Sequence, residues 1–353
     1  MNIVILDASA ANPGDLSWEA ISKFAEETGG TFTAYDVTTQ DQLIERAKDA
    51  EVLFTNKTLF DEEAFEKLPK LKYIGVLATG FNVVDLKAAS AHSVTVTNVP
   101  EYATFATAQM AIALMLELAA KVGIHSASVH DGGWVKSPQF CYTIAPLMEL
   151  AGKTMVVVGM GKIGRQVARV AVALGMKVIG VPHTMPLEKK LPILDVDSCA
   201  GGAAGADCSA GADCSAGVAR GTVIDLMTLD EAIRLADVIS FHCPLTPETN
   251  GLLCKDLLAK AKDGLLAINT ARGPVAVEAD VSEALKTGKL GGYACDVISV
   301  EPMKADNPLL GAPNCIITPH IAWAPKETRA RLIQVAADNL ASFVDENPIN
   351  VVN

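Results

Sequence analysis

The chain has 353 residues, of which 50% are hydrophobic and 20% charged, and its formal net charge is -12. A single hydrophobic core stops growing near about 250 to 300 residues, so this length predicts two domains. The acidic balance repels phosphate backbones and anionic lipid, and no basic patch offsets it. We therefore expect neither a nucleic acid nor a membrane as a partner.

The N-terminus and the cysteines bear on the cellular compartment. Residues 1–7 lack a basic segment followed by a long apolar run, so we interpret them as a first strand and not as a signal peptide. Apolar runs elsewhere are too short or too interrupted to span a bilayer. The eight cysteines show no zinc-finger spacing with histidine, and we expect them to be reduced thiols. These features predict a cytoplasmic protein.

The first hundred residues alternate strand-like and helix-like stretches, and this β-α-β order predicts parallel strands. After them, residues 106–121 are predicted to form a long helix. Its apolar side chains nearly surround it, so we expect it to be buried between domains or subunits. The predicted strands are residues 3–6, 52–54, 73–77 and 94–97, and the predicted earlier helices are residues 18–28 and 39–49.

A second β-α-β series follows, and a last helix at residues 326–345 would return the chain to the first domain. The sequence therefore predicts an α/β fold of two doubly wound parallel-sheet domains, with a cleft at the carboxyl ends of the strands. A Rossmann cofactor domain, residues 99–325, is inserted in a smaller flavodoxin-like substrate domain, residues 1–98 and 326–353. The second series comprises strands at residues 154–158, 178–181, 238–242, 265–269, 292–296 and 316–318.

Residues 198–217 are rich in Gly, Ala and Cys, and residues 205–210 repeat without change as residues 211–216. Such small residues cannot build a core, so we interpret the segment as a surface insertion. No histidine is nearby, and ordering a glycine-rich chain is costly in entropy, so we expect no metal site. The alternative is a metal site, whose ligands would be Asp207, Cys208, Asp213 and Cys214.

A GxGxxG motif lies directly after a predicted strand and before a helix with an apolar face, which is the context of a dinucleotide site. Gly159 permits the tight turn, Gly161 allows a pyrophosphate to approach the backbone, and Gly164 allows close packing of helix on strand. The amino end of the helix favours the anion. Lys162 and Ile163, inside the motif, belong to the predicted cofactor site.

The choice of coenzyme depends on the end of the next strand. NAD enzymes usually place Asp or Glu about 20 residues after the glycines, where it binds the ribose hydroxyls. This chain has Val181, Pro182 and His183 there. Without the carboxylate, repulsion of the NADP 2′-phosphate is relaxed, yet no arginine is present to bind that phosphate. We expect NAD, with NADP or use of both coenzymes as the alternatives.

Three charged residues follow predicted strands of the second series, at the edge where a cleft should lie: Arg272, Glu301 and His320. These residue types suit hydride transfer to a 2-keto acid. An arginine can bind the carboxylate and polarise the keto oxygen. A histidine can donate the proton as a general acid, and a glutamate can orient its imidazole and favour its protonated form. The three together predict a catalytic site.

Longer stretches of the chain resemble the D-isomer-specific 2-hydroxyacid dehydrogenase family, most closely its glycerate dehydrogenase (hydroxypyruvate reductase) members. The resemblance covers nearly the whole chain apart from the insertion at 198–217. It implies an enzyme that transfers hydride between a nicotinamide cofactor and hydroxypyruvate or D-glycerate, with Arg272, Glu301 and His320 as catalytic residues. It is carried by NPGDLSW at 12–18, ATGFNVVD at 78–85, NVPEY at 98–102, TPHIAWA at 318–324 and NPINVVN at 347–353.

The resemblance also implies binding residues. The backbone amides of Thr79 and Gly80 would receive the substrate carboxylate, since a turn containing glycine presents N–H groups to an anion. Lys57 is a candidate for added positive charge, with a solvated surface lysine as the alternative. The cofactor residues would be Thr107 at the phosphate or nicotinamide side, Cys243 and Pro244 at the adenine side, Asp296 at the carboxamide, and also His183, Thr270, Ala271 and His320.

Members of this family are typically dimers through the cofactor domain, and the helix at 106–121 with the segment to residue 150 suits such a contact. A homodimer is therefore expected. Two alternatives to the expected function stay open at this point. The same catalytic residues could serve D-lactate, glyoxylate or another 2-keto acid, because the shape of the pocket sets that choice. The chain could also be a binding protein that senses NAD(H) without turnover.

Overall fold

The computed structural model describes residues 1–193 and 222–353, so the predicted insertion at 198–217 and its alternative metal ligands lie outside the described residues. The chain divides into two compact units. Unit 1 comprises Met1–Ala103 and Trp323–Asn353, and unit 2 comprises Thr104–Ala322. Unit 2 is thus inserted in unit 1.

Unit 1 contains a sheet of five parallel strands in the order β2-β1-β3-β4-β5. This is the flavodoxin-like order, so the predicted fold of this part is confirmed. β2 was not predicted, because it is a three-residue edge strand without a buried residue. The strands are β1 (Ile3–Ile5), β2 (Phe32–Ala34), β3 (Val52–Thr55), β4 (Tyr73–Val76) and β5 (Thr95–Thr97).

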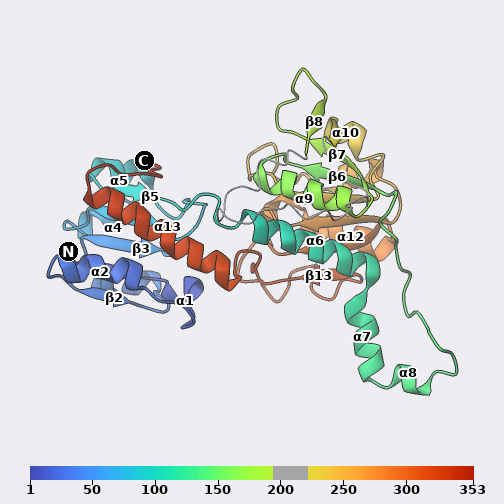
Figure 1. Cartoon of the computed structure of the whole chain (residues 1–353), viewed down its shortest axis with the longest axis horizontal. Coiled ribbons are helices and arrows are strands. Elements are labelled where there is room, and N and C mark those ends of the chain that lie inside the picture. Colours follow the sequence, from blue (N-terminus) through green and yellow to red (C-terminus); the bar gives the residue numbers. More distant parts are fainter. Residues whose placement is uncertain (194–221) are drawn as a thin grey trace, which may run out of the picture. The chain divides into compact units, whose positions relative to one another are not determined.

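Helices cover both faces of this sheet, and each face has its own apolar core. Asp61 and Asp85 begin two of the helices as N-caps, accepting backbone N–H groups of the first turn. The last helix packs on α2, and the Arg329 side chain pairs with both oxygens of Asp15 at 2.7 and 2.8 Å. One face carries α1 (Ala8–Ala11), α2 (Glu19–Glu27) and α13 (Lys326–Val344), and the other carries η1 (Gln40–Gln42), α3 (Leu43–Ala47), α4 (Glu62–Lys67) and α5 (Leu86–Ala91) (Figure 1).

Unit 2 contains an eight-stranded sheet in the order β13-β12-β11-β10-β6-β7-β9-β8, parallel except for β8. From β9 to β12 this is the Rossmann order 3-2-1-4-5-6, which confirms the predicted class. The two strands that were not predicted, β8 and β9, lie at one edge. The strands are β6 (Thr154–Val158), β7 (Lys177–Val181), β8 (Lys190–Pro192), β9 (Val223–Leu226), β10 (Val238–Phe241), β11 (Leu265–Asn269), β12 (Leu290–Cys295) and β13 (Cys315–Ile317).

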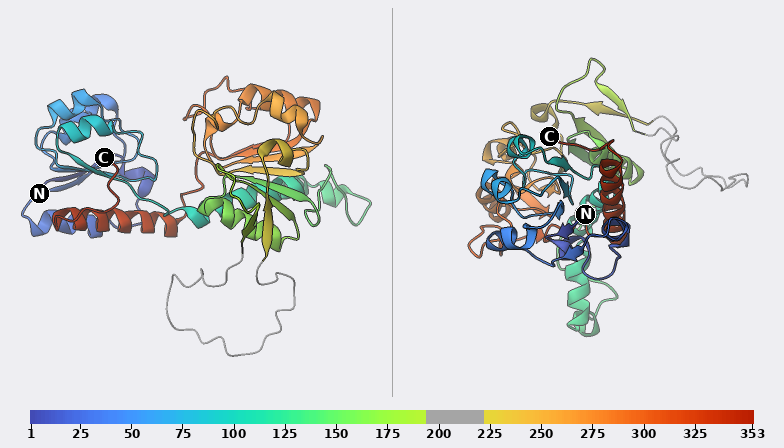
Figure 2. Two further views of the ribbon diagram at one scale, coloured as in Figure 1. Left: turned by 90° about the horizontal axis from the view of Figure 1, so that it is seen from above. Right: turned by 90° about the vertical axis from the view of Figure 1, so that its left-hand side faces the viewer.

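The sheet of unit 2 also has helices on both faces (Figure 2). The long helix α6 packs on α9 and on strands β11 and β12. The expectation that it is buried between domains or subunits is therefore wrong for most of its apolar surface, which the core of unit 2 covers. One face carries α6 (Thr104–Ala120) and α9 (Lys162–Ala173), and the other carries α10 (Leu229–Ala232), α11 (Lys255–Lys260), η3 (Gly273–Val275) and α12 (Glu278–Thr287).

Two short helices, α7 (Val122–His130) and α8 (Gly133–Lys136), project from the body of unit 2 (Figure 1). Neither contains a buried residue. Among the described residues, no single helix is long and apolar enough to cross a membrane. Together α6 and α7 reach that length and composition, but they are bent by 59° at the break between them.

Candidate active site

The glycine motif forms the turn between β6 and α9. Gly159 has a φ of 95°, and a Cβ there would lie 2.6 Å from the carbonyl oxygen of His242. A Cβ on Gly164 would lie 2.0 Å from the carbonyl oxygen of Gly159. Gly161 instead faces open space and is the N-cap of α9, and no described side chain caps that helix. The amide end of α9, where Lys162 and Ile163 begin the helix, is thus open to an anion.

The surrounding residues fit a dinucleotide. β6 and β10 are neighbours at the point where the strand order reverses, which is where doubly wound sheets bind nucleotides. Cys243 is buried and Pro244 exposed directly after β10, and Thr107 is buried in the first turn of α6. The hydroxyl of Thr270, after β11, is buried without a hydrogen-bond partner in the described part of the chain. A bound cofactor would satisfy such an atom.

His183 and Thr184, just after β7, are exposed, and no acid stands among them, but the charge of a carboxylate on another loop acts here. Glu248 lies in the loop after β10. A hydrogen bond from the Thr246 side chain and, more weakly, the charge of His183 hold the pKa of Glu248 below its usual value. A carboxylate from the loop after β10 therefore interacts electrostatically with His183, where the sequence itself has no acid. Sequence reasoning missed Glu248, because it is about 65 residues further along the chain.

Arg272 is placed by the turn that follows β11. The fully buried Asn269 accepts the Ala271 N–H through Oδ1 at 3.1 Å and donates through Nδ2 to the Arg272 carbonyl oxygen at 2.9 Å. The exposed guanidinium donates to the Ala271 carbonyl oxygen at 2.7 Å. Asn269 was not among the predicted site residues, although a polar residue ending a buried strand was a signal for it.

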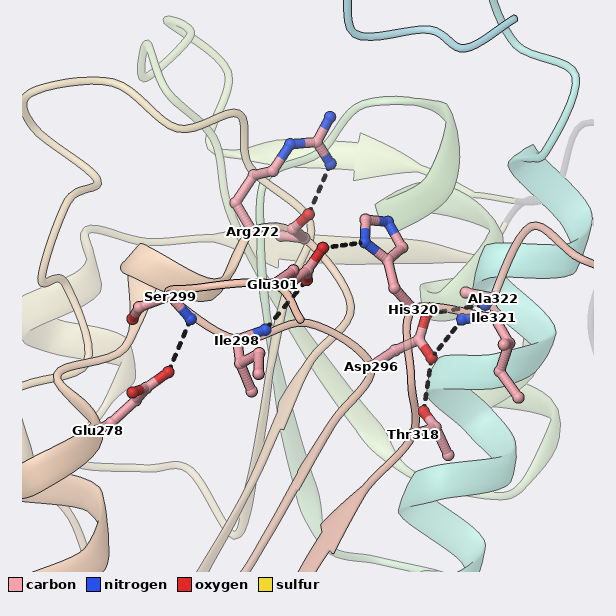
Figure 3. Close-up of polar contacts among 11 residues, drawn as sticks. Arg272, Glu278, Asp296, Ile298, Ser299, Glu301, Thr318, His320, Ile321 and Ala322 are labelled. Carbon is pink, nitrogen blue, oxygen red and sulfur yellow. Dashed lines mark hydrogen bonds and ion pairs between the residues drawn. The ribbon is translucent and has the colours of Figure 1, made fainter. Parts of the chain in front are cut away.

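Glu301 and His320 form an ion pair (Figure 3). Glu301 Oε2 lies 2.7 Å from His320 Nδ1, while Glu301 Oε1 accepts the Ile298 N–H at 3.3 Å. With Nδ1 engaged, Nε2 is the ring nitrogen left to meet a substrate. The exposed fractions of the two side chains are 34% for His320 and 32% for Glu301, so solvent and small molecules reach the pair.

Asp296 holds the backbone that carries His320. The carboxylate is only 1% exposed, and it accepts from the Thr318 hydroxyl at 2.6 Å and from the amides of Ile321 and Ala322 at 2.9 and 2.8 Å. These bonds hold His320 at a φ of 56°, which is uncommon for a residue with a side chain. A carboxylate has about four acceptor sites, so the predicted carboxamide contact stays compatible with this role.

The predicted substrate residues belong to unit 1. The Thr79 hydroxyl donates to the Val99 carbonyl oxygen at 2.9 Å, and Asn98 Nδ2 donates to the Thr79 carbonyl oxygen at 2.8 Å. These two hydrogen bonds hold the turn that contains Gly80. Lys57 is exposed in a loop whose amides at residues 56–58 all donate to one oxygen of the buried Asp7 at 3.0 to 3.1 Å. Asp7 was missed, because its partners are about 50 residues away.

Within the described ranges, 1–193 and 222–353, the cysteines and the other residue types that bind metals form neither a candidate metal site nor a disulfide. No group of three or more His, Cys, Asp or Glu residues there could hold a metal ion. The five cysteines described are free thiols, and burial raises the pKa of those at Cys243, Cys295 and Cys315. Raised thiol pKa values disfavour the reactive thiolate.

Similar proteins are found by sequence and by structure. Residues 112–200 and 213–322 match the family model described as D-isomer specific 2-hydroxyacid dehydrogenase, NAD binding domain. The chain is 43% identical to the hydroxypyruvate reductase of Blautia hydrogenotrophica, covering 100% of both chains, and 36% identical to the glycerate dehydrogenase of Methylorubrum extorquens over 89% of each. The crystal structure of the TT0316 protein from Thermus thermophilus matches with a TM-score of 0.81 and 30% identity, covering 100% of both chains.

Proposed function

This chain belongs to the D-2-hydroxyacid dehydrogenase family, and from that premise we propose that it reduces hydroxypyruvate to D-glycerate or catalyses the reverse reaction. The observation that carries the proposal is the Glu301–His320 ion pair in a dinucleotide-binding fold. The pair and Arg272 all follow strands at the carboxyl edge of the same sheet. A binding protein that only senses the dinucleotide would not need a general acid with a matched carboxylate. Two relatives, at 43% and 36% identity, are named for hydroxypyruvate and glycerate, which supports this substrate.

The mechanism assigns one task to each side chain. Arg272 binds the substrate and polarises its keto oxygen. Within unit 1, the amides of Thr79 and Gly80 are the groups proposed to receive a carboxylate. The cofactor, when bound, supplies the hydride that the keto carbon accepts. His320 Nε2 gives its proton to the keto oxygen, so the product is a secondary alcohol and the imidazole becomes neutral. Glu301, on Nδ1, orients the ring and stabilises the charged form that the reaction consumes.

NAD(H) is the coenzyme in this proposal, with NADPH or dual use as the alternative. The open amide end of α9 suits the pyrophosphate of either one. The carboxylate of Glu248 near His183 would oppose the 2′-phosphate that distinguishes NADPH. No arginine stands at Val181, Pro182 or His183 to bind that phosphate. The remaining predicted contacts, Thr107, Cys243, Pro244, Thr270, Ala271 and Asp296, belong to the same proposed site.

A homodimer and a cytoplasmic location complete the proposal. The projecting helices α7 and α8 and the segment after them expose apolar side chains, of which Val135 is 88% and Phe140 89% exposed. Exposed apolar groups of this kind are typical of a surface that a partner covers, and the partner here would be a second copy of the chain. The free thiols of the described cysteines support a reducing compartment.

The test is NADH oxidation by the purified protein with hydroxypyruvate, glyoxylate, pyruvate and phenylpyruvate, repeated with NADPH. The highest kcat/KM is expected for hydroxypyruvate with NADH. A higher value for glyoxylate or pyruvate would keep the mechanism and change the substrate. Tight NADH binding without turnover of any 2-keto acid would refute the proposed reaction. The His320→Ala variant serves as the control for contaminating dehydrogenases.

A further inference from the structure

The loop that carries Glu301, residues 297–307, has little regular structure of its own. It follows β12, and within it Ile298 is buried while Ser299 and Glu301 are exposed. The backbone of Ile298 bonds directly to the Glu301 carboxylate at 3.3 Å. The position of that carboxylate, and with it the orientation of His320, therefore depends on what holds residues 298 and 299.

Gly273, the residue after Arg272, lies directly against this backbone. A Cβ on Gly273 would lie 1.9 Å from the carbonyl carbon of Ile298, 2.0 Å from its oxygen and 2.4 Å from the Ser299 nitrogen. These are backbone atoms, so the contact cannot be relieved by turning a side chain. The turn that carries Arg272 and the loop that carries Glu301 are thus in main-chain contact, which only a glycine permits.

Glu278, the first residue of α12, is hydrogen-bonded to the Glu301 loop, and its bond to Ser299 is drawn in Figure 3. Its Oε1 accepts the Ser299 N–H at 2.7 Å, and its Oε2 accepts from Asn307 Nδ2 at 2.8 Å. One carboxylate therefore holds the Glu301 loop on both sides of Glu301. Hydrogen bonds to an ionised acceptor are about twice as strong as neutral ones, so this is a firm attachment.

We propose that Gly273 and Glu278 form a clamp that sets the spacing between Arg272 and the Glu301–His320 pair. Glu278 acts through the backbone of residues 298 and 299 and is a positioning residue. The proposal rests on the proposed function, in which these three side chains act on one substrate molecule. Transition-state stabilisation is sensitive to such spacing, since a misplacement of about 1 Å can reduce the rate about 100-fold.

Glu278 could also have a purely structural role, as an acid in the first turn of a helix. A matched control variant distinguishes that role from the proposed positioning of the Glu301 loop. Asp280 lies in the same turn of α12 and also accepts one backbone N–H, that of Lys255 at 2.8 Å, but its partner belongs to α11. Asp280→Ala removes comparable charge and hydrogen bonding without touching the Glu301 loop. Glu278→Gln is the conservative variant, because its amide oxygen can still accept from Ser299.

The experiment compares these variants in the full-length protein with the preferred 2-keto acid and NADH. Glu278→Ala is expected to lower kcat by about 10- to 100-fold, with NADH affinity, measured by fluorescence titration, unchanged within about twofold. Gly273→Ala, which displaces the same contact sterically, should lower kcat to the same extent. Glu278→Gln should have a kcat between those of Glu278→Ala and the wild type. Asp280→Ala should have the kcat of the wild type. If Glu278→Ala and Asp280→Ala reduce kcat equally, the clamp is wrong.

A second readout does not need turnover. The imidazole proton resonances of His320, assigned with a His320→Gln variant among the six histidines of the chain, report the Glu301 contact directly. They should move in Glu278→Ala and stay in place in Asp280→Ala. If the wild type turns over no 2-keto acid but this pattern appears, the proposed function fails and the clamp stands. Resonances that stay in place in both variants would overturn the clamp.

Discussion

Replacing Asp7 tests how the loop that carries Lys57 is held. The Asp7 side chain is 8% exposed, and its Oδ2 accepts from the amides at residues 56–58 and from the hydroxyls of Thr55 and Thr58. In Asp7→Ala the amide of Lys57, an exposed residue, can turn to water, and the Thr55 hydroxyl can keep its second acceptor at 3.3 Å. The buried amides of Asn56 and Thr58 lose their acceptor. Each buried amide without an acceptor costs about 1 to 2 kcal/mol, so the free energy of unfolding should fall by about 2 to 4 kcal/mol.

Urea unfolding followed by tryptophan fluorescence measures this difference. Trp18 and Trp323 belong to unit 1 and the exposed Trp134 to unit 2, so a Trp134→Phe background makes the signal specific to unit 1. Asp61→Ala, which removes a carboxylate that accepts the single amide of Ala64, is the matched control and should cost about 1 kcal/mol. A loss in Asp7→Ala no greater than in Asp61→Ala would refute the reasoning.

The same carboxylate predicts a pH dependence. Burial acts to raise the pKa of Asp7, but the hydrogen bonds from the 55–58 loop outweigh it, so the pKa lies below its usual value. A carboxyl whose pKa is lower in the folded than in the unfolded state stabilises the fold above its unfolded pKa of about 3.9. This contribution is lost as the pH falls through the folded pKa. The difference in unfolding free energy between wild type and Asp7→Asn should therefore be constant near neutral pH. Below about pH 4 this difference should decrease toward zero.

Three further predictions concern catalysis, coenzyme and assembly. His320→Ala should lower kcat by orders of magnitude with NADH affinity near wild type in a fluorescence titration, and surviving activity would disprove its role as the acid. Glu248→Gln should raise the ratio of kcat/KM for NADPH to that for NADH, because a charge opposing the 2′-phosphate is removed, and an unchanged ratio would exclude Glu248 from coenzyme choice. Phe140→Glu combined with Val135→Glu should give a monomer in light scattering, whereas a dimer in this variant would place the interface elsewhere.

All strands except β2, β8 and β9 could be predicted from the sequence, including the edge strands β5 and β13. The predicted strands at residues 154–158 and 265–269 coincide with β6 and β11, because strands buried on both faces appear as uninterrupted apolar runs. β2, β8 and β9 lie at or next to sheet edges, and β2 and β8 contain no fully buried residue. Such segments have too little apolar periodicity to be distinguished from loops.

The helix at residues 106–121 shows a different limit. Its sequence is apolar on nearly all sides, which correctly predicted a buried helix, α6 at Thr104–Ala120. The apolar character of a helix does not predict which elements pack against it, however. Here α9, β11 and β12 cover α6 inside unit 2. Exposed apolar side chains are more numerous on α7, α8 and the segment after them than on α6, and the sequence did not distinguish these parts.

By itself the sequence determined the chemistry that is local in the chain: the glycines between β6 and α9, and the residue types Arg272, Glu301 and His320 after successive strands. Only the tertiary structure decided which groups meet. Parallel strands bring their carboxyl ends to one edge of the sheet, so side chains 19 residues apart, Glu301 and His320, come within 2.7 Å. Glu278 reaches Ser299 across 21 residues, and the charge of His183 acts on Glu248. Contacts between distant segments follow from register and loop path, which no local pattern encodes.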